Sequence, residues 1–390
     1  MTDAMLNRRQ FLSRVGTVAG AATIGMIVPD RLCAASTRPT APVSLARCGS
    51  YELTEVLAGL QRALEPIGGL KKLVTGKTVA IKLNLTGNPA QGILGLPSGR
   101  TYQTNPAVAR ALAILLDRAG ARRIRFVEGT YEDVPFESTL KSGGWDLSAL
   151  TALGARVEFE DTRNRGYAKQ YHLVKVPNGG SLFPAYELNH SYVDCDVYIS
   201  LAKMKNHATA GVTLSMKNNF GITPTALYGQ HEPNEHTTQS RVDIFHNGQD
   251  SPAAGLPQEV DPHGPRVPSY RVPRHIVDAI RIRPIDLAII DGIESVSGGE
   301  GPWNGLLTRQ TPHLLVAGRN PVCTDAITTV CMGYDPMGAS ATGPFPGDNH
   351  LAMAAQLGLG TNNPKEIEVR GLSIIEALHP YGWQPAQRHT

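Results

Sequence analysis

The stretch TVAIKL at residues 78–83 decides the fold, since it is a short apolar run rich in β-branched residues, which is typical of a buried strand. Asn105 and Pro106 then supply a helix cap and a proline at the first helical position, and Gly120 marks the end of that helix. A second apolar run, IRFV at residues 124–127, predicts another strand. Strand, helix and strand in this order indicate two parallel strands joined by a right-handed crossover.

The same alternation continues along the chain of 390 residues. Apolar periodicity predicts further elements: helices over 53–64, 275–282 and from Pro321 onward, and strands over 197–201, 287–290 and 313–317. We therefore expect an α/β fold, with a mostly parallel sheet and helices on both faces, in one main domain. Residues 223–272 lack periodicity, so we expect a long irregular insertion over the surface, a kind of segment that often carries function.

The N-terminus predicts export. Arg8 and Arg9 precede an apolar stretch at residues 15–28, which is the pattern of a twin-arginine signal peptide. The stretch is shorter than the roughly 20 residues that a bilayer requires, so we expect no permanent membrane anchor. With cleavage after Ala35, the chain is expected to have three parts: a signal peptide (1–35), an exposed linker (36–50) and the domain (51–390). The predicted partner is the twin-arginine export machinery, and the predicted location is the periplasm or the exterior.

Charge and cysteine content narrow the class of function. The chain has 37 basic and 34 acidic residues, and removal of a signal peptide would leave a net charge near +1, which is too small for a general nucleic-acid surface. The cysteines beyond the signal are Cys48, Cys195, Cys323 and Cys331, and none forms a C-x-x-C pair. We therefore expect no nucleic-acid partner and no cysteine cluster for an iron–sulfur centre.

Polar side chains follow the predicted strands at the points where the strands end. Ligands bind outside the carboxyl ends of the strands in open parallel sheets, so these residues should meet at one edge. They come from four strands: Lys82 and Asn84 from the first, Glu128 from the second, Lys203, Lys205 and His207 from the third, and Asp291 from the fourth. A single Asp-Gly or Glu-Gly pair is ordinary turn chemistry, but their convergence predicts a shared site.

The densest basic stretch is LAKMKNHATAGVTLSMKNNFG at residues 201–221, which carries Lys203, Lys205, His207 and Lys217. Ammonium groups this close repel one another unless carboxylates or a bound anion balance them. One interpretation is internal ion pairing with four candidate carboxylates: Glu128, Asp291, Glu300 and Asp325. The other is a small anionic ligand, a carboxylate or phosphate, that the lysines hold as point charges.

The run from Lys203 to Gly221 resembles the core motif of the domain of unknown function 362 family. Further landmarks agree in order over about residues 79–336: Asn105-Pro106, Glu128-Gly129, Asp291-Gly292, Glu300 to Gly305, and Asn320 to Asp325. The family has no general assigned reaction. Many of its members look like fusions to ferredoxin-type iron–sulfur modules, so the resemblance implies redox or cofactor-related work. This chain departs from that pattern because it has no cysteine cluster.

A divalent metal is an open alternative, and the cofactor is otherwise unknown. Its candidate ligands are His207, Asp291, Glu300 and the loop histidines His231, His236, His246 and His263. The run HEPNEH at residues 231–236 is not the zinc-protease helix motif, because its histidines are five residues apart and it contains a proline.

Two hypotheses follow for the function. The first is an enzyme that acts on a small anionic substrate, with His207 or Asp291 moving protons. The alternative is a non-catalytic binding or maturation protein for a small ligand or metal cofactor at the same edge. The residues expected to bind the ligand are Lys82, Asn84, Glu128, Lys203, Lys205, Lys217, Asn218, Glu300 and Asp325.

Overall fold

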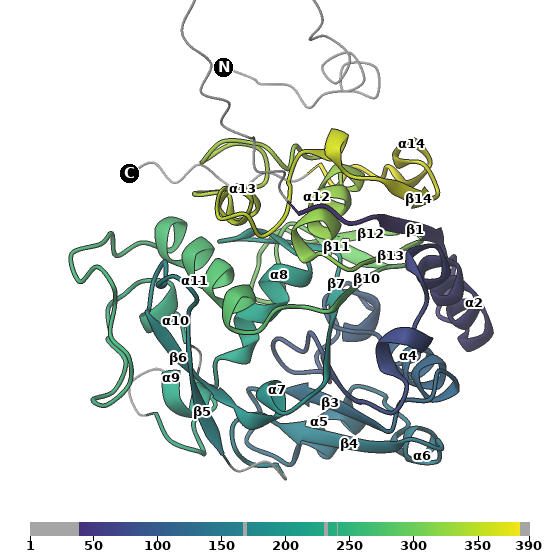
Figure 1. Ribbon diagram of the computed structural model, residues 1–390, viewed down its shortest axis with the longest axis horizontal. Coiled ribbons are helices and arrows are strands. Elements are labelled where there is room, and N and C mark those ends of the chain that lie inside the picture. Colours follow the sequence, from purple (N-terminus) through teal and green to yellow (C-terminus); the bar gives the residue numbers. More distant parts are fainter. Residues whose placement is uncertain (1–38, 167–169, 230–232, 240, 383–390) are drawn as a thin grey trace, which may run out of the picture. The chain divides into compact units, whose positions relative to one another are not determined.

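The computed structural model describes residues 39–166, 170–229, 233–239 and 241–382, so the predicted signal peptide lies outside the described residues. The centre of the fold is an eight-stranded sheet with the order β14-β1-β13-β10-β7-β2-β3-β4 (Figure 1). Its strands are β1 (Val43–Arg47), β2 (Thr78–Lys82), β3 (Arg123–Glu128), β4 (Arg156–Asp161), β7 (Val197–Lys203), β10 (Leu287–Gly292), β13 (Leu314–Gly318) and β14 (Val369–Gly371).

The sheet is mostly parallel, as predicted. Strands β10, β7, β2, β3 and β4 pair in parallel, and β14 pairs in parallel with β1. Strand β13 is antiparallel to both of its neighbours, β10 and β1. The carboxyl ends of the five parallel strands therefore lie along one edge.

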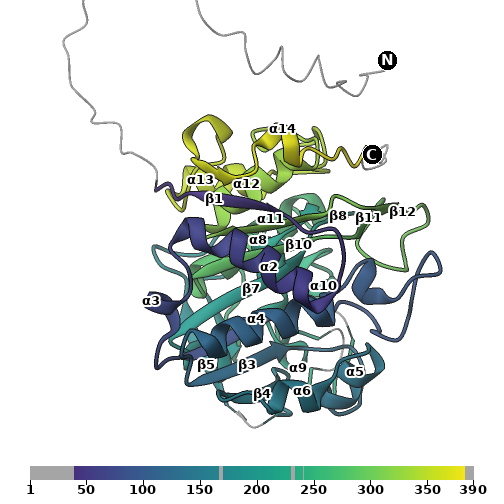
Figure 2. The same ribbon diagram turned by 90° about the vertical axis from the view of Figure 1, so that its right-hand side faces the viewer.

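Helices cover both faces of this sheet, which confirms the α/β class. Alternate residues of a strand point to opposite faces, so Val79 and Ile81 of β2 join one core while Ala80 joins the other. Helices α2 (Leu53–Leu64) and α4 (Pro106–Arg118) pack on the first face (Figure 2). The second face carries α8 (Ser215–Asn218), α11 (Pro268–Ile282) and α12 (Pro321–Cys331).

The helix starts follow the local sequence signals. The side chain of Asn105 accepts a hydrogen bond from the Ala107 backbone N–H ahead of α4, and Asn320 does the same for Cys323 ahead of α12. In both helices a proline occupies the first turn, where its missing N–H costs nothing. These two helix starts could be predicted from the sequence because the capping residue and the proline affect only the backbone within a few residues of them.

Smaller elements surround the sheet. Three two-stranded ribbons pair β5 (Tyr171–Lys175) with β6 (Ala185–Asn189), β8 (Lys205–His207) with β9 (Gly211–Thr213), and β11 (Ser295–Ser297) with β12 (Thr308–Gln310). The short helices are α3 (Lys71–Val74), α5 (Phe136–Ser142), α6 (Leu147–Thr151), α7 (His190–Val193), α9 (Thr225–Tyr228), α10 (Val242–Phe245), α13 (His350–Gln356) and α14 (Ile374–Ala377). None of the helices in the described part of the chain combines the length and apolarity that a membrane crossing requires.

Two sequence-based predictions of domain organisation are wrong. The expected linker at 36–50 contains β1, an internal strand of the sheet with Val43 and Leu45 buried. Its sheet partners lie more than 250 residues further along the chain, so nothing local marks it as a strand. The expected surface insertion at 223–272 buries Ile244 and Phe245 in the core, and α11 begins at Pro268, ahead of the predicted start at 275.

Candidate functional site

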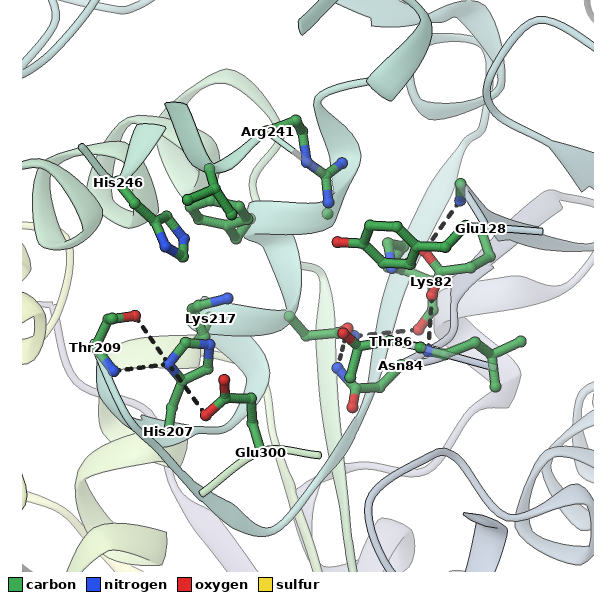
Figure 3. A pocket seen from close by; sticks show the side chains of 18 of the residues that line it. Lys82, Asn84, Thr86, Glu128, His207, Thr209, Lys217, Arg241, His246 and Glu300 are labelled. Atoms are coloured by element: carbon green, nitrogen blue, oxygen red, sulfur yellow. Dashed lines mark hydrogen bonds and ion pairs between the residues drawn. The ribbon is translucent and has the colours of Figure 1, made fainter. Parts of the chain in front are cut away.

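A cavity of about 520 Å³ opens at the carboxyl ends of β2 and β3, as expected for an open parallel sheet. Its size lies within the range of pockets that bind small molecules. Figure 3 shows Arg241 and His246 on one side, His207 and Glu300 on another, Lys82, Asn84 and Glu128 on a third, and Lys217 between them. Seven of the predicted site residues thus line one cavity: Lys82, Asn84, Glu128, His207, Lys217, Asn218 and Glu300.

The Lys82–Glu128 pair forms one wall. The Lys82 ammonium donates to Glu128 Oε1 at 2.5 Å and to the Leu83 carbonyl at 2.7 Å. Glu128 also accepts the backbone N–H groups of Leu85 and Gly129. Burial lowers the pKa of Lys82, and Glu128 opposes that shift. This carboxylate is therefore committed to its protein partners.

Two amides continue the wall. Asn84 donates through Nδ2 to Asn218 Oδ1 at 3.0 Å, and Asn218 donates through Nδ2 to Ser200 Oγ at 3.0 Å. The Oδ1 atom of Asn84 is buried and has no hydrogen-bond partner among the described residues. An unsatisfied buried acceptor of this kind is costly, so the neighbouring contacts must hold Asn84 in place.

His207 is a neutral hydrogen-bond donor toward the cavity. Its Nδ1 accepts the backbone N–H groups of Thr209 at 3.1 Å and Ala210 at 3.2 Å. This places the ring proton on Nε2. Burial lowers the pKa of His207 well below its ordinary value, and the nearby Lys217 adds to that shift. His207 is therefore neutral throughout the physiological pH range.

Glu300 is the second carboxylate of the cavity. Its Oε2 accepts the backbone N–H of Ala208 at 2.8 Å, and its Oε1 accepts the indole N–H of Trp303 at 2.7 Å. Glu300 Oε2 also lies 3.8 Å from His207 Nδ1. Like Glu128, this carboxylate is occupied by protein donors.

Lys217 differs from the other basic groups of the cavity. It projects from α8 into the cavity, and its Nζ lies 4.1 Å from the centroid of the Phe220 ring. It has neither a hydrogen bond nor an ion pair with any residue in the described ranges. Burial lowers the pKa of Lys217 to about 7, and Arg241 and Lys82 act in the same direction while Glu300 opposes them. Near neutral pH this lysine is therefore divided between ammonium and free amine.

Arg241 and His246 complete the basic side of the cavity. The Arg241 side chain is 6% exposed and donates to the Thr223 carbonyl, and its Nε has no partner in the described part of the chain. Its guanidinium carbon lies 5.5 Å from the centroid of the Phe220 ring, which Lys217 also contacts. His246 packs edge-on against the same ring, and burial lowers its pKa to about 3. His246 is therefore neutral, whereas Arg241 is charged.

Four of the predicted site residues do not line this cavity. Lys203 donates to Asp291 at 2.9 Å, and both side chains are fully buried. Lys205 donates to the backbone carbonyls of Tyr102 and Glu300, and therefore ties together two loops that border the cavity. Asp325 accepts the N–H groups of Ser215 and Met216 at the start of α8, and burial raises its pKa to about 7. These four hold the surrounding structure in place.

The cavity also contains side chains that the sequence did not single out: Thr86, Tyr131, Thr209, Phe220, Arg241 and Trp303. Arg241 and His246 lie in the aperiodic segment 223–272, where no pattern distinguishes one polar residue from the next. The sequence feature that pointed to this segment as functional was its unusual length. Trp303 lies in the glycine-rich turn after β11, and its ring is close enough to Gly87 that a Cβ there would come within 2.9 Å of it.

The described residues do not include an arranged set of metal ligands. Among the described residues, no group of three or more His, Cys, Asp or Glu side chains is placed to hold a metal ion. Of the loop histidines, His246 lines the cavity, His236 and His263 are exposed, and His231 lies outside the described residues. The four cysteines Cys48, Cys195, Cys323 and Cys331 are free thiols.

Comparison with known proteins places the chain in a family. The model of the family described as "Domain of unknown function (DUF362)" matches residues 79–330. The chain belongs to this family. The thylakoid-associated protein sll1697 of Synechocystis is 28% identical over 353 residues, which are 87% of this chain and 89% of that protein. The DUF362 match confirms the resemblance drawn from the motifs.

Two solved structures show a distant likeness. A Thermotoga maritima protein from a structural genomics programme superposes over 83% of this chain with a TM-score of 0.36 and 12% identity. The lactate racemase apoprotein of Thermoanaerobacterium thermosaccharolyticum superposes over 70% with a TM-score of 0.36 and 15% identity. The chain spans 61% and 54% of the length of these two proteins.

The buried ion pair between Lys203 and Asp291 predicts that replacing Asp291 strongly destabilises the fold. We expect Asp291→Asn to lower the free energy of unfolding by about 3–5 kcal/mol, because it leaves the Lys203 ammonium buried without a counter-charge. Urea denaturation measures this loss. The matched control is Glu368→Gln, since Glu368 pairs with Arg370 at the surface, where solvent screens the pair, and its loss should change stability far less. Unchanged stability in Asp291→Asn would show that the pair is not structural.

Proposed function

We propose that this DUF362 protein is an enzyme that binds a small carboxylate in the cavity and acts on it with the amine of Lys217. The observation that carries the proposal is the Lys217 side chain itself, which faces the cavity beside Phe220 and has no counter-ion among the described residues. Three basic side chains, Lys82, Lys217 and Arg241, line the cavity with two carboxylates.

An anionic ligand would restore the balance of charge. Glu128 and Glu300 already accept hydrogen bonds from protein donors, and neither makes an ion pair with Lys217. A carboxylate placed between Lys217 and the guanidinium of Arg241 would receive charge-assisted hydrogen bonds from both side chains. The Nε2–H of His207 offers a donor to the rest of such a ligand.

A catalytic role is favoured over simple binding by the pKa of Lys217. A lysine that only held an anion would do so best with an ordinary pKa, at which it is always charged. A pKa of about 7 instead provides free amine at neutral pH, and amines with lowered pKa values serve as bases and nucleophiles in enzymes. The alternative, a binding or maturation protein, would use the same cavity without turnover.

The proposal predicts that ligand binding takes up a proton. A bound carboxylate stabilises the Lys217 ammonium and raises its pKa, so acetate binding at pH 7.5 should be accompanied by proton uptake and should weaken as the pH rises further. His207 and His246 should add no proton uptake in this range, because burial lowers the pKa of each of them well below neutral pH. Calorimetry in two buffers with different ionisation enthalpies measures this uptake.

Variants provide the matching control. Lys217→Met should weaken acetate binding about ten- to a hundredfold, which corresponds to the loss of one charge-assisted hydrogen bond. Lys175→Met, which removes an exposed lysine of β5, should leave the affinity unchanged. Equal affinity in the two variants, or binding heat that is independent of the buffer, would contradict the proposal.

We further propose that the chain is exported through the twin-arginine route. The proposal is supported by Arg8 and Arg9 ahead of the apolar stretch at 15–28, which lie outside the described residues. Replacing both arginines by lysine should keep the protein inside the cell, as cell fractionation would show, while Arg14→Lys should be exported normally. Export that is unaffected by the double replacement would refute this route.

A further inference from the structure

We propose that Lys217 forms an imine with the carbonyl carbon of a small 2-oxo acid that carries an apolar or aromatic side chain. This inference rests on the proposed function and names the substrate class of the same cavity. Three features of the described residues support it. One of four lysines lacks a partner, Arg241 lies beside that lysine, and aromatic rings line the remaining space.

The first feature is that Lys217 is set apart from the three buried lysines near this edge of the sheet. Lys82 donates to Glu128, Lys203 donates to Asp291, and Lys205 donates to two backbone carbonyls. Those contacts occupy the three amino groups, so none of them is free to react. Lys217 instead faces the ring of Phe220 and the cationic side chain of Arg241, which disfavours a second charge.

The second feature is the place of Arg241. Lys217 and Arg241 lie against the same Phe220 ring, and Figure 3 shows both side chains directed toward the same space. A carboxylate next to the reacting carbonyl can therefore bind the guanidinium of Arg241 while the carbonyl carbon meets the amine. A simple aldehyde or ketone would leave the charge of Arg241 unbalanced.

The third feature is the size and lining of the cavity. A cavity of about 520 Å³ can hold a drug-sized molecule, so a three-carbon acid would leave much of it empty. Tyr131, Phe220 and Trp303 line the cavity, and Trp303 is 54% exposed. These rings fit an apolar or aromatic substituent on the oxo acid.

The step balances without any further reactant. The Lys217 nitrogen attacks the carbonyl carbon, and the carbonyl π electrons move to the oxygen, which takes up a proton to become a hydroxyl group. The hydroxyl group then takes up a second proton and leaves as water, while the nitrogen lone pair forms the C=N bond. The amine nitrogen gives up two protons in all, which are the two that the oxygen takes up. The net change is amine plus carbonyl to imine plus water, with no change of oxidation state. His207, with its proton on Nε2, can donate a hydrogen bond to the carbonyl oxygen.

Reductive trapping tests the inference on the full chain. Phenylpyruvate and cyanoborohydride at pH 7 should convert most of the protein to a single covalent adduct, which peptide mapping should place on Lys217. Lys217→Met should lose this adduct, whereas Lys175→Met should keep it at full yield. Peptide mapping of the adduct on the unaltered protein identifies the modified lysine even if a variant folds poorly. Adducts spread over surface lysines, or the same yield in Lys217→Met, would overturn the inference.

A matched pair of probes tests the role of Arg241. Phenylacetone has the ketone and ring of phenylpyruvate without its carboxylate. Arg241→Gln should raise the phenylpyruvate concentration for half-maximal labelling at least tenfold more than that for phenylacetone, because both probes share any effect of Arg241 on the Lys217 amine. An equal change for both probes would show that Arg241 does not bind the carboxylate of the substrate.

Calorimetry separates this inference from the proposed function. If carboxylates bind in a manner that depends on Lys217 and no adduct forms, the imine is wrong and the anion site stands. If neither acetate nor phenylpyruvate binds, both proposals fail together.

Discussion

The rest of the site depends on one constraint: Lys217 faces the cavity, half-buried, and neither of the cavity's two carboxylates forms an ion pair with it among the described contacts. Glu128 is held by Lys82 and by backbone N–H groups, and Glu300 is held by Ala208 and Trp303. Removing an ammonium group from water is costly unless a partner compensates it. Lys217 has no hydrogen bond or ion pair among the described residues, so the removal of its ammonium from water lowers its pKa.

The surrounding fold keeps this arrangement from relaxing. The ion pair between Lys203 and Asp291 joins β7 to β10, and Lys205 binds the loops that carry Tyr102 and Glu300. Asp325 fixes the first residues of α8, the helix that presents Lys217. These buried groups outside the cavity thus have hydrogen-bond partners, while the lysine inside it is left without one in the described part of the chain. Such an unfavourable group persists when the structure around it leaves no alternative position, which is a common property of functional sites.

Local sequence signals predicted much of the fold because they act over short distances. The strand at 78–83 and the cap at Asn105-Pro106 are readable from a few neighbouring residues, and the structure confirms both. The strand β1 was missed because its partners, β13 and β14, lie near the other end of the chain. The segment 223–272 was taken for a surface insertion because it lacks periodicity, yet Phe245 packs in the core.

The site was predictable in part for the same reason. Strand ends gather at one edge, and Lys82, Asn84, Glu128 and His207 line one cavity there, as the sequence predicted. The sequence could not show that Lys203 and Asp291 are directly opposite in the register of neighbouring strands β7 and β10, which lets them neutralise each other. Nor could it show that Arg241 reaches the cavity from an aperiodic segment.

The titration of Lys217 tests the central claim most directly. In protein with ¹³C-labelled lysines, the Cε resonance that disappears in Lys217→Arg identifies this side chain, and its shift can be followed with pH. We expect a midpoint at about 7, more than three pH units below the ordinary lysine value of 10.5. A midpoint near 10.5 would mean that Lys217 is an ordinary solvated cation, and it would contradict a reactive amine in this cavity.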